Sequence, residues 1–337
     1  MSLPSPYRVL ASHGPTTFPA IFPFSQRDLV PNDSAPASDF YTYSRLVNHI
    51  DDHAVQNLQR FYGAVLPLNS SPTGQPGSTT VAKILDICSS WVSHIPFSTT
   101  ATSTLPSISP RNQVIGIGMN AKELEANGIL SHWLVHDLDL QPDFRQALKQ
   151  ASKGTAYPTL KKLVSTPDSP QEPSPEGPFD AVICNVSIDY LSRPLEVMEQ
   201  VAENLKPGGW AYMAISNRCF PTKAVRPWLN LSTTDRLHLV ASYFYFAGTS
   251  YDATDQNSTK GVASILQRLR TGVSAGLSLG NGQTADQKPN PDTVEKTKYQ
   301  PGELFEDIEA IVLVEEDNRE GYDPLWIVRG KRKESPS

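Results

Sequence analysis

The segment Phe179–Asn217, FDAVICNVSIDYLSRPLEVMEQVAENLKPGGWAYMAISN, carries the pattern that decides the fold. It begins with a near-continuous apolar run over residues 179–187, which is typical of a strand covered on both faces of a sheet. Residues 193–205 then predict an amphipathic helix, because apolar side chains recur at helical spacing. KPGG ends this helix, with Gly208 suited to a left-handed stop, and a strand follows over 210–216. Strand and helix therefore alternate, as in an α/β fold.

The same alternation extends in both directions along the chain. Apolar runs predict strands over 82–88, 113–118 and 132–138, and helices are predicted near 120–128, 141–152 and 232–247. Two last strands, 308–316 and 324–332, are joined by a short linker and should be antiparallel neighbours. We therefore predict an α/β three-layer sandwich whose mostly parallel seven-stranded sheet ends in an antiparallel hairpin. Ligands of such sheets bind at the carboxyl ends of the strands, where strand order reverses.

Composition divides the rest of the chain. We expect an irregular N-terminal segment at 1–38, a helical N-terminal lid at 39–68 and a Gly/Pro/Ser-rich linker at 69–80. The core should span 81–249 and 301–332. Residues 164–178 read as a low-complexity loop, and 250–300 as a polar, partly disordered insertion within the core.

Bulk properties exclude several classes of protein. The 337 residues carry a net charge of -6 with scattered Lys and Arg, which argues against a nucleic-acid partner. No apolar run approaches the roughly 18 residues that cross a bilayer, so no membrane partner is expected. Three cysteines fit neither a zinc pattern nor a disulfide framework, which favours a reducing, cytoplasmic location. Organelle import is the alternative, since residues 1–27 lack acids, but their prolines disfavour an amphipathic helix.

On these segments the chain resembles the class I S-adenosylmethionine-dependent methyltransferases. In that family FDxV opens the fourth strand and LKPGG leads into the fifth, and both occur within Phe179–Asn217. The resemblance covers 81–216 and the hairpin at 305–332, and implies a Rossmann-like fold with S-adenosyl-L-methionine as cofactor. NRCFPTKAV and LDICSSWVSHIP further resemble a methyltransferase-like subgroup that lacks the glycine-rich first motif.

The resemblance implies cofactor contacts, with departures. Asp86 holds the position of the first acid, but Cys88, Ser89 and Ser90 stand where the family has glycines, and Trp91 could narrow the pocket. Gly118 stands where the family has an acid for the ribose hydroxyls; Asn120 could compensate or serve only as a helix cap. Asp137 holds the position that contacts the adenine amino group. The implied cofactor-binding residues are Asp86, Cys88, Ser89, Ser90, Asn120, Asp137 and Asn185.

Acceptor-side candidates follow the later strands and the lid. His238 and His94 could act as a base, or could be core or packing histidines. Asp189 could orient the acceptor or cap the next helix. Arg218, Lys223 and Arg226, with Phe220 and Trp228, could hold an anionic aromatic acceptor or form a solvated loop. Tyr41 in the lid and Tyr190 complete the substrate candidates, namely Tyr41, Tyr190, Arg218 and Trp228. His49 and His53 lack a third ligand, so no metal is expected.

These observations support two functions of different classes. The first is methyl transfer from S-adenosylmethionine to O, N or C of a small-molecule acceptor. The second is a catalytically inactive methyltransferase-like protein that binds or assembles with a protein partner, which the missing glycines and ribose acid favour. A third reading keeps the pocket for another adenine nucleotide.

Overall fold

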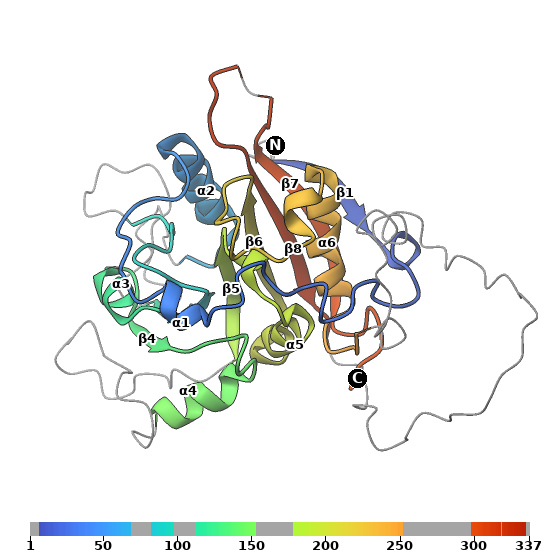
Figure 1. The fold of residues 1–337 in the computed structure, drawn as a ribbon, viewed down its shortest axis with the longest axis horizontal. Helices are drawn as coiled ribbons and strands as arrows, with labels where there is room; N and C mark the ends of the chain where they lie inside the picture. The colour runs from blue at the N-terminus through green and yellow to red at the C-terminus, as the bar shows by residue number, and fades with distance from the viewer. Residues whose placement is uncertain are drawn as a thin grey trace, which may run out of the picture.

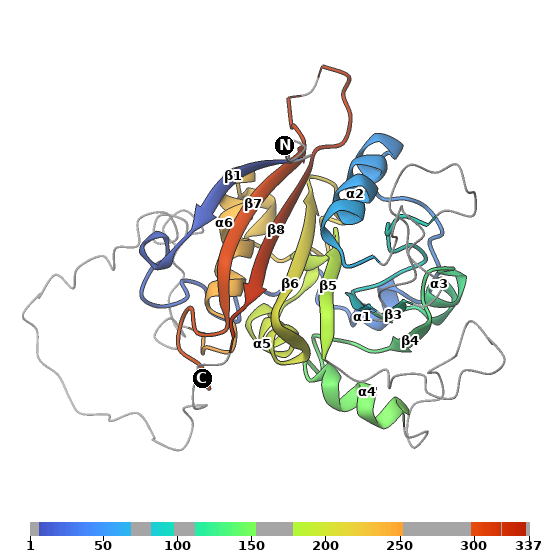
Figure 2. The same cartoon turned by 180° about the vertical axis from the view of Figure 1, so that it is seen from behind.

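The computed structural model describes residues 7–68, 82–97, 112–152, 178–251, 298–317 and 319–334. These form one eight-stranded sheet with the order β1-β7-β8-β6-β5-β2-β3-β4 and helices on both faces (Figures 1 and 2). The strands are β1 (Arg8–His13), β2 (Lys83–Ile87), β3 (Gln113–Gly118), β4 (His132–Val135), β5 (Phe179–Asn185), β6 (Leu205–Ser216), β7 (Phe305–Val314) and β8 (Leu325–Arg332). The helices are α1 (Ala37–Phe40), α2 (Asp52–Val65), α3 (Ala121–Ala126), α4 (Phe144–Ser152), α5 (Pro194–Asn204) and α6 (Thr233–Tyr245).

The predicted α/β architecture is confirmed. β4, β3, β2, β5 and β6 are parallel, and β8 and β7 form the predicted antiparallel hairpin. Strand order reverses between β2 and β5, because the chain runs outward from β2 to β4 and then returns to β5. The carboxyl ends of β2 and β5 therefore mark the expected position of a ligand site.

The sheet has eight strands rather than the predicted seven. The additional strand, β1, lies in the segment expected to be irregular and pairs antiparallel with β7 at the sheet edge. The sequence of β1, RVLASH, lacks the apolar alternation that marks a half-buried strand, and its side chains are mostly exposed. Only the pairing with β7, which is distant in sequence, makes this segment a strand.

The two faces of the sheet have separate cores. On one face, Leu85 and Ile87 of β2 pack in a cluster with α4, α5, α6 and the N-terminal Phe22. On the other, Ile84 packs with α2 and α3. Alternate residues of β2 thus enter opposite cores, which is why the parallel strands read as continuous apolar runs.

The predicted helical lid at 39–68 takes a different form. Its main helix, α2, buries Leu58 and Phe61 against the sheet and belongs to the core. Residues 41–51 between α1 and α2 form no helix, and several of them cover the site described below. Apolar spacing predicts which residues are helical, but not which surface the helix covers.

Other expectations fall outside the described residues. The linker at 69–80, nearly all of the loop at 164–178 and most of the insertion at 250–300 lie there. Within the described ranges, no helix is both long and apolar enough to cross a membrane.

Candidate active site

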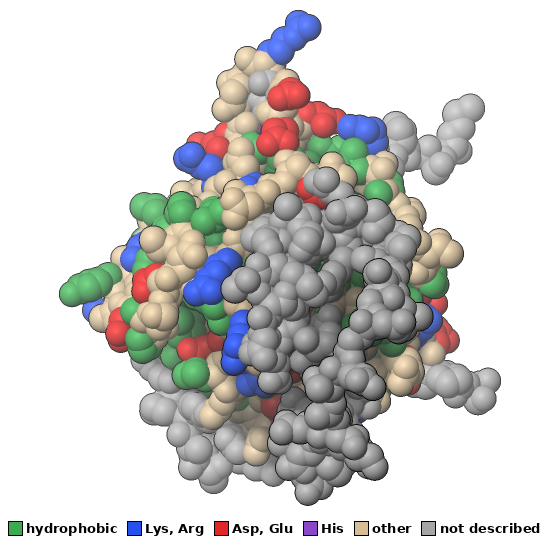
Figure 3. Space-filling model, turned by 45° about the vertical axis from the view of Figure 1, so that its right-hand side comes forward, with side chains coloured by type: hydrophobic (Ala, Val, Ile, Leu, Met, Phe, Trp, Pro, Cys, Tyr) green, Lys and Arg blue, Asp and Glu red, His purple; other side chains and the backbone are tan. Residues whose placement is uncertain are grey.

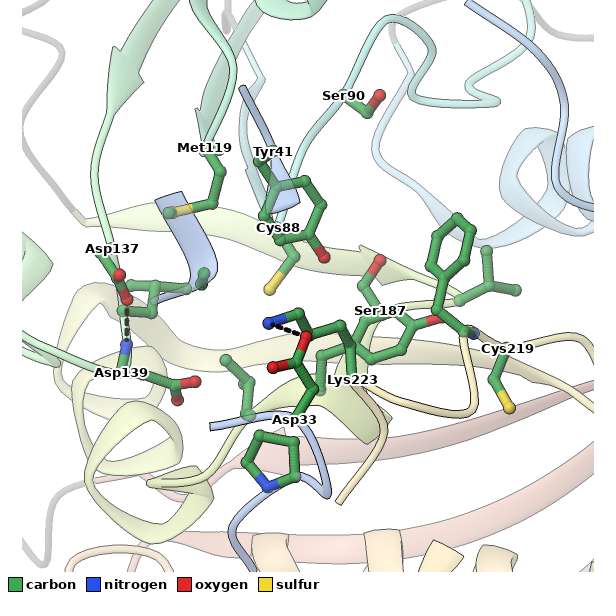
Figure 4. Close-up of a pocket in the computed structure, with 18 of the residues that line it drawn as sticks. Asp33, Tyr41, Cys88, Ser90, Met119, Asp137, Asp139, Ser187, Cys219 and Lys223 are labelled. Atoms are coloured by element: carbon green, nitrogen blue, oxygen red, sulfur yellow. Dashed lines mark hydrogen bonds and ion pairs between the residues drawn. The ribbon is translucent and has the colours of Figure 1, made fainter. Parts of the chain in front are cut away.

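A cavity of about 960 Å³ opens at the carboxyl ends of β2, β3 and β5. Small-molecule sites span about 300–1,000 Å³, so this cavity is large enough for two ligands side by side. One end is lined by the loops after β2, β3 and β4. The other is lined by residues 30–49, by the segment after β5 and by residues 217–236. We call these the strand-loop end and the basic end. Figure 4 shows Asp137 and Asp139 on one side of the cavity, and Ser187 and Cys219 on the opposite side.

The loop after β2 is held in place by hydrogen bonds. Cys88 adopts a left-handed backbone with φ 53°, a conformation that glycine takes more easily. The Ser89 N–H donates to the carbonyl of Ile117 on β3 at 2.7 Å. Cys88, Ser89 and Ser90 all line the cavity, so this glycine-free loop forms one of its walls.

Gly118 at the end of β3 makes room for that loop. A Cβ placed on Gly118 would lie 2.0 Å from the carbonyl oxygen of Ser89, a distance that no side chain can occupy. The glycine required for close backbone approach is therefore on β3 rather than in the loop. This contact also explains why Gly118 cannot be an acid.

Asp86 lies behind the loop rather than in the large cavity. Its carboxylate accepts hydrogen bonds from Ser89 Oγ at 2.7 Å and Ser93 Oγ at 2.6 Å. Burial raises the pKa of Asp86 to about 7, and the two hydroxyl donors partly oppose that rise. Asp86 therefore holds the loop in place, and reaches only a small side cavity that it shares with Asn185 and His94.

Glu123 is a buried acid in the first turn of α3, the helix that follows β3. Its carboxylate accepts from the backbone N–H of Arg45 at 2.7 Å and from Ser90 Oγ at 2.7 Å, and it lines the cavity. Asn120 caps α3 as predicted, accepting from the N–H groups of Lys122 and Glu123, while its Nδ2 donates to the Tyr41 carbonyl. Asn120 also lines the cavity, but its side chain is largely engaged in these contacts.

Asp137 and Asp139 line the cavity beyond β4. Asp137 Oδ1 accepts from the backbone N–H groups of Asp139 and Leu140, which shapes the turn (Figure 4). Asp139 accepts from the Ser192 N–H, and burial raises its pKa to about 6. Asp137 therefore lines the strand-loop end, and its predicted contact with the adenine amino group stays a prediction.

The basic end combines cations with aromatic rings. The lining cations are Arg45, Arg218, Lys223, Arg226 and Arg236, and the lining aromatic residues are Tyr41, Tyr190 and Phe220. The Arg45 guanidinium lies over Phe40 and Phe220, at 4.3 and 5.6 Å from the ring centroids. Residues 30–49 and 217–236 meet here, although they are far apart in sequence.

A histidine, His49, also belongs to the basic end. It lines the cavity and makes an edge contact with Phe220, with ring centroids 5.2 Å apart. Burial lowers the pKa of His49, so its imidazole is neutral at neutral pH and can accept a proton. By contrast, burial raises the pKa of Tyr41 and Tyr190, whose hydroxyls stay protonated.

Several candidates from the sequence lie away from the large cavity. His238 stacks on Phe18 and makes a tilted ring contact with His13 of β1. His94 is buried in the side cavity, and burial lowers its pKa to about 4. Trp228 is buried against Arg236. The structure therefore does not bring His238 or Trp228 to the cavity, because their helical and loop spacing points them into the core.

Asp189 lies behind the cavity wall. It is buried, one of its carboxylate oxygens has no hydrogen-bond partner among the described residues, and burial raises its pKa to about 7. The neighbouring Tyr190 does line the cavity, and its hydroxyl accepts from the Phe220 N–H at 2.9 Å. Asn185 accepts from the Tyr62 hydroxyl and donates to the Ser93 carbonyl, again behind the β2 loop.

Sequence reasoning did not assign site roles to His49, Glu123 or Arg236, which all line the cavity. Glu123 was interpreted as part of a helix-start signal, yet its carboxylate contacts Arg45 and Ser90. Glu123 lies in the first turn of α3, which follows β3, and this position in the sequence could have identified it as a site residue. Nothing local marks Arg236. In the described part of the chain, no group of three or more His, Cys, Asp or Glu residues could hold a metal ion.

Residues 115–246 match the family model described as a methyltransferase domain. Over these residues the chain is similar to the methyltransferase class that its sequence resembles. S-adenosylmethionine is the cofactor of that class. The match begins within β3 and spans under half of the chain, so β2 and its glycine-free loop lie outside it.

Solved structures that resemble this chain share little sequence with it. A chain from the complex of the Haloferax volcanii Trm112 methyltransferase activator and the putative methyltransferase is 13% identical, with a TM-score of 0.35, covering 84% of this chain and 90% of that one. N-methyltransferase NodS from Bradyrhizobium japonicum is 11% identical, with a TM-score of 0.30, and the match covers 75% of this chain and 87% of that one. A possible histamine N-methyltransferase from Thermotoga maritima is 12% identical, with a TM-score of 0.32, and the match covers 83% of this chain and 89% of that one. Among curated proteins there is no match.

Proposed function

We propose that this methyltransferase transfers the methyl group of S-adenosylmethionine to O, N or C of a small-molecule acceptor. The observation that carries the proposal is the single cavity of about 960 Å³ at the switch point of the sheet, which has an acidic strand-loop end and a basic, aromatic end. One ligand can lie at each end, so donor and acceptor can meet between them.

The strand-loop end fits the cofactor. Asp137 would accept from the adenine amino group through its second oxygen, for which the described residues supply no hydrogen bond. Glu123 would accept from the ribose, because a carboxylate has about four acceptor sites and two of these are used. Cys88, Ser89 and Ser90 would form the wall beside the methionine part. When bound, the cofactor supplies an activated methyl group that needs little further acid–base chemistry.

The residues of the chain then position the acceptor and handle its proton. The Tyr41 and Tyr190 hydroxyls, which stay protonated, would donate to a polar atom of the acceptor. His49, neutral at neutral pH, would accept the proton that an O or N acceptor releases. Figure 4 shows Tyr41 beside Cys88, facing Lys223 and Asp33 across the cavity.

The alternative is an inactive methyltransferase-like binding protein. One observation favours it: both oxygens of Glu123 and the side chain of Asn120 already bind other parts of the chain, which leaves fewer acceptors for a ribose. In this case a protein partner, rather than a small molecule, would be the relevant ligand. The expected absence of a nucleic-acid partner and the cytoplasmic location stay predictions.

Calorimetric titration with S-adenosylhomocysteine and S-adenosylmethionine separates these functions. We expect micromolar binding that Asp137→Ala weakens by about tenfold, the loss typical of a charge-assisted hydrogen bond. Asp143→Ala is the matched control, because Asp143 also accepts from a backbone N–H but is exposed and does not line the cavity. Absence of binding at millimolar ligand would refute methyl transfer by the isolated chain and would favour the alternative.

A further inference from the structure

The charges that line the cavity are divided between its two ends. The lining carboxylates are Asp33, Glu123, Asp137 and Asp139, and all except Asp33 belong to the strand-loop end. All five lining cations belong to the basic end, namely Arg45, Arg218, Lys223, Arg226 and Arg236. A ligand at the basic end therefore meets an excess of positive charge within a partly enclosed space, where charge acts more strongly than in bulk water.

Two of these cations are neutralised by carboxylates. Lys223 is buried and its Nζ lies 2.9 Å from Asp33 Oδ2 and 3.0 Å from the Ala35 carbonyl (Figure 4). Arg218 is exposed and lies 3.4 Å from an oxygen of Asp323. Both cations hold neighbouring segments together at the cavity, and neither is the first choice for binding a ligand.

Of the other three cations, Arg45 lies over the Phe40 and Phe220 rings, and Arg226 and Arg236 remain available. No carboxylate among the described residues pairs with Arg226, which is exposed to the cavity. Arg236 donates from Nε to the Trp228 carbonyl at 3.0 Å and lies 5.3 Å from the Trp228 ring centroid. This contact fixes the base of the guanidinium and leaves its terminal N–H groups without a described acceptor. Arg236 also lies near the buried Asp189, where its positive charge partly offsets the rise that burial causes in the pKa of Asp189.

The same end offers flat apolar surfaces. The Tyr190 and Phe220 rings lie with centroids 6.1 Å apart, and Phe220 also contacts Phe40 and His49. The Tyr41 hydroxyl has no described hydrogen-bond partner. On the face shown in Figure 3, Lys and Arg side chains also lie close to hydrophobic ones. An aromatic ring fits such a wall, and guanidinium groups bind carboxylates through paired hydrogen bonds.

We propose that the acceptor is an aromatic carboxylate, whose carboxylate binds Arg226 and Arg236 and whose ring packs on Tyr190 and Phe220. The proposal rests on the proposed methyl transfer, because it assigns the ligand of the basic end of the same cavity. It also explains the division of charge: the acid-lined end receives the cationic donor and the cation-lined end receives an anionic acceptor. Arginine suits this role better than lysine, because its planar fork matches a carboxylate.

The test measures binding of matched probes to the full chain saturated with S-adenosylhomocysteine. The probes are 4-hydroxybenzoate, its neutral amide 4-hydroxybenzamide and the cationic tyramine, together with the larger pair 6-hydroxy-2-naphthoate and 6-hydroxy-2-naphthamide. We expect at least one carboxylate to bind about tenfold more tightly than its amide, and tyramine to bind most weakly.

Variants locate the effect. Arg226→Gln and Arg236→Gln should each remove most of the preference for carboxylate over amide, while both variants still bind S-adenosylhomocysteine. Arg60→Gln, on the exposed side of α2, removes the same charge outside the cavity and should keep the preference. Retained binding of S-adenosylhomocysteine shows that each variant is folded.

The outcomes separate the two proposals. If S-adenosylhomocysteine does not bind the wild-type chain, the proposed function and the acceptor assignment both fail. If it binds but neither carboxylate is preferred over its amide, the acceptor assignment alone is wrong. A preference that Arg60→Gln reduces as much as Arg226→Gln would show long-range attraction rather than a site, and would also overturn the assignment.

Discussion

The two ends of the cavity are built in different ways. The strand-loop end consists of loops that leave adjacent parallel strands, and hydrogen bonds such as Ser89 N–H to the Ile117 carbonyl tie these loops to the sheet. The basic end is assembled from residues 30–49 and 217–236, which contact each other through Lys223, Asp33 and the Arg45–Phe220 pair. One end therefore depends on sheet packing, and the other depends on long-range contacts between segments. Changes at the two ends should have separable effects.

The largest effect is expected from Gly118→Ala. The added Cβ would meet the Ser89 carbonyl at 2.0 Å, so the β2 loop must move. Overpacking of this kind costs about 1–3 kcal/mol, and the displaced loop should also abolish binding of S-adenosylhomocysteine. Urea unfolding and calorimetric titration measure the two effects.

Gly128→Ala is the matched control for this substitution. A Cβ on Gly128 has nothing within 4 Å, so stability and binding should be close to those of the wild type. If Gly118→Ala binds the cofactor as the wild type does, the loop is not the rigid wall that distinguishes the strand-loop end.

A pH-dependent effect is expected from Asp86→Asn. The pKa of Asp86 is raised to about 7 by burial, whereas in the unfolded chain it is about 4. The folded state therefore holds an extra proton between these values, and stability should fall as pH rises through this window. One proton corresponds to about 1.4 kcal/mol per pH unit.

Urea unfolding between pH 5 and pH 8 measures the change of slope. The amide of Asp86→Asn cannot titrate. Below pH 7 the unfolding free energy of the variant should therefore fall less steeply with pH than that of the wild type, by about 1.4 kcal/mol per pH unit. The variant should still show some dependence of stability on pH, because burial also raises the pKa of Asp189 to about 7 and that of Asp139 to about 6. Identical slopes in variant and wild type would show that Asp86 is ionised in the folded chain, contrary to this description of the loop.

The basic end should respond differently, and Lys223→Ala tests it. Lys223 holds Asp33 and the Ala35 carbonyl, so its loss should release residues 30–49 from the loop after β6. We expect amide exchange around Asp33 and Arg45 to become about tenfold faster, while the affinity for S-adenosylhomocysteine changes by less than about threefold.

Lys331→Ala provides the comparison for Lys223→Ala. Lys331 pairs with Glu306 at 3.2 Å on the surface of the β7–β8 hairpin, where ion pairs contribute little. Its removal should leave exchange at residues 30–49 unchanged. A large loss of cofactor affinity in Lys223→Ala would mean that the two ends are coupled rather than separable.

The contrast between the ends also decides what could be predicted from sequence. Apolar periodicity and caps identified seven strands and Asn120 as the cap of α3, because these signals are local. Asp137 lines the cavity because it follows β4, one of the parallel strands whose carboxyl ends face that cavity, while its contact with the cofactor stays a prediction. His49 and Arg236 were missed as site residues, since only folding brings segments 30–49 and 217–236 together. His238 was predicted to be either a base or a core histidine, and the helix turns it toward β1, an orientation that depends on an unpredicted strand.

The smallest effect, and the sharpest test of the strand-loop end, concerns Glu123. If Glu123 accepts from the ribose, Glu123→Gln replaces a charged acceptor with a neutral one. The affinity for S-adenosylhomocysteine should then fall by about fivefold. Ser90→Ala removes the hydroxyl that donates to Glu123 but keeps the carboxylate, so it should not weaken binding. If both variants weaken binding equally, the Ser90–Glu123 hydrogen bond matters for loop shape alone. If both variants instead bind S-adenosylhomocysteine as tightly as the wild type, Glu123 does not contact the ribose. The ribose would then have no acidic partner, as expected of the inactive alternative.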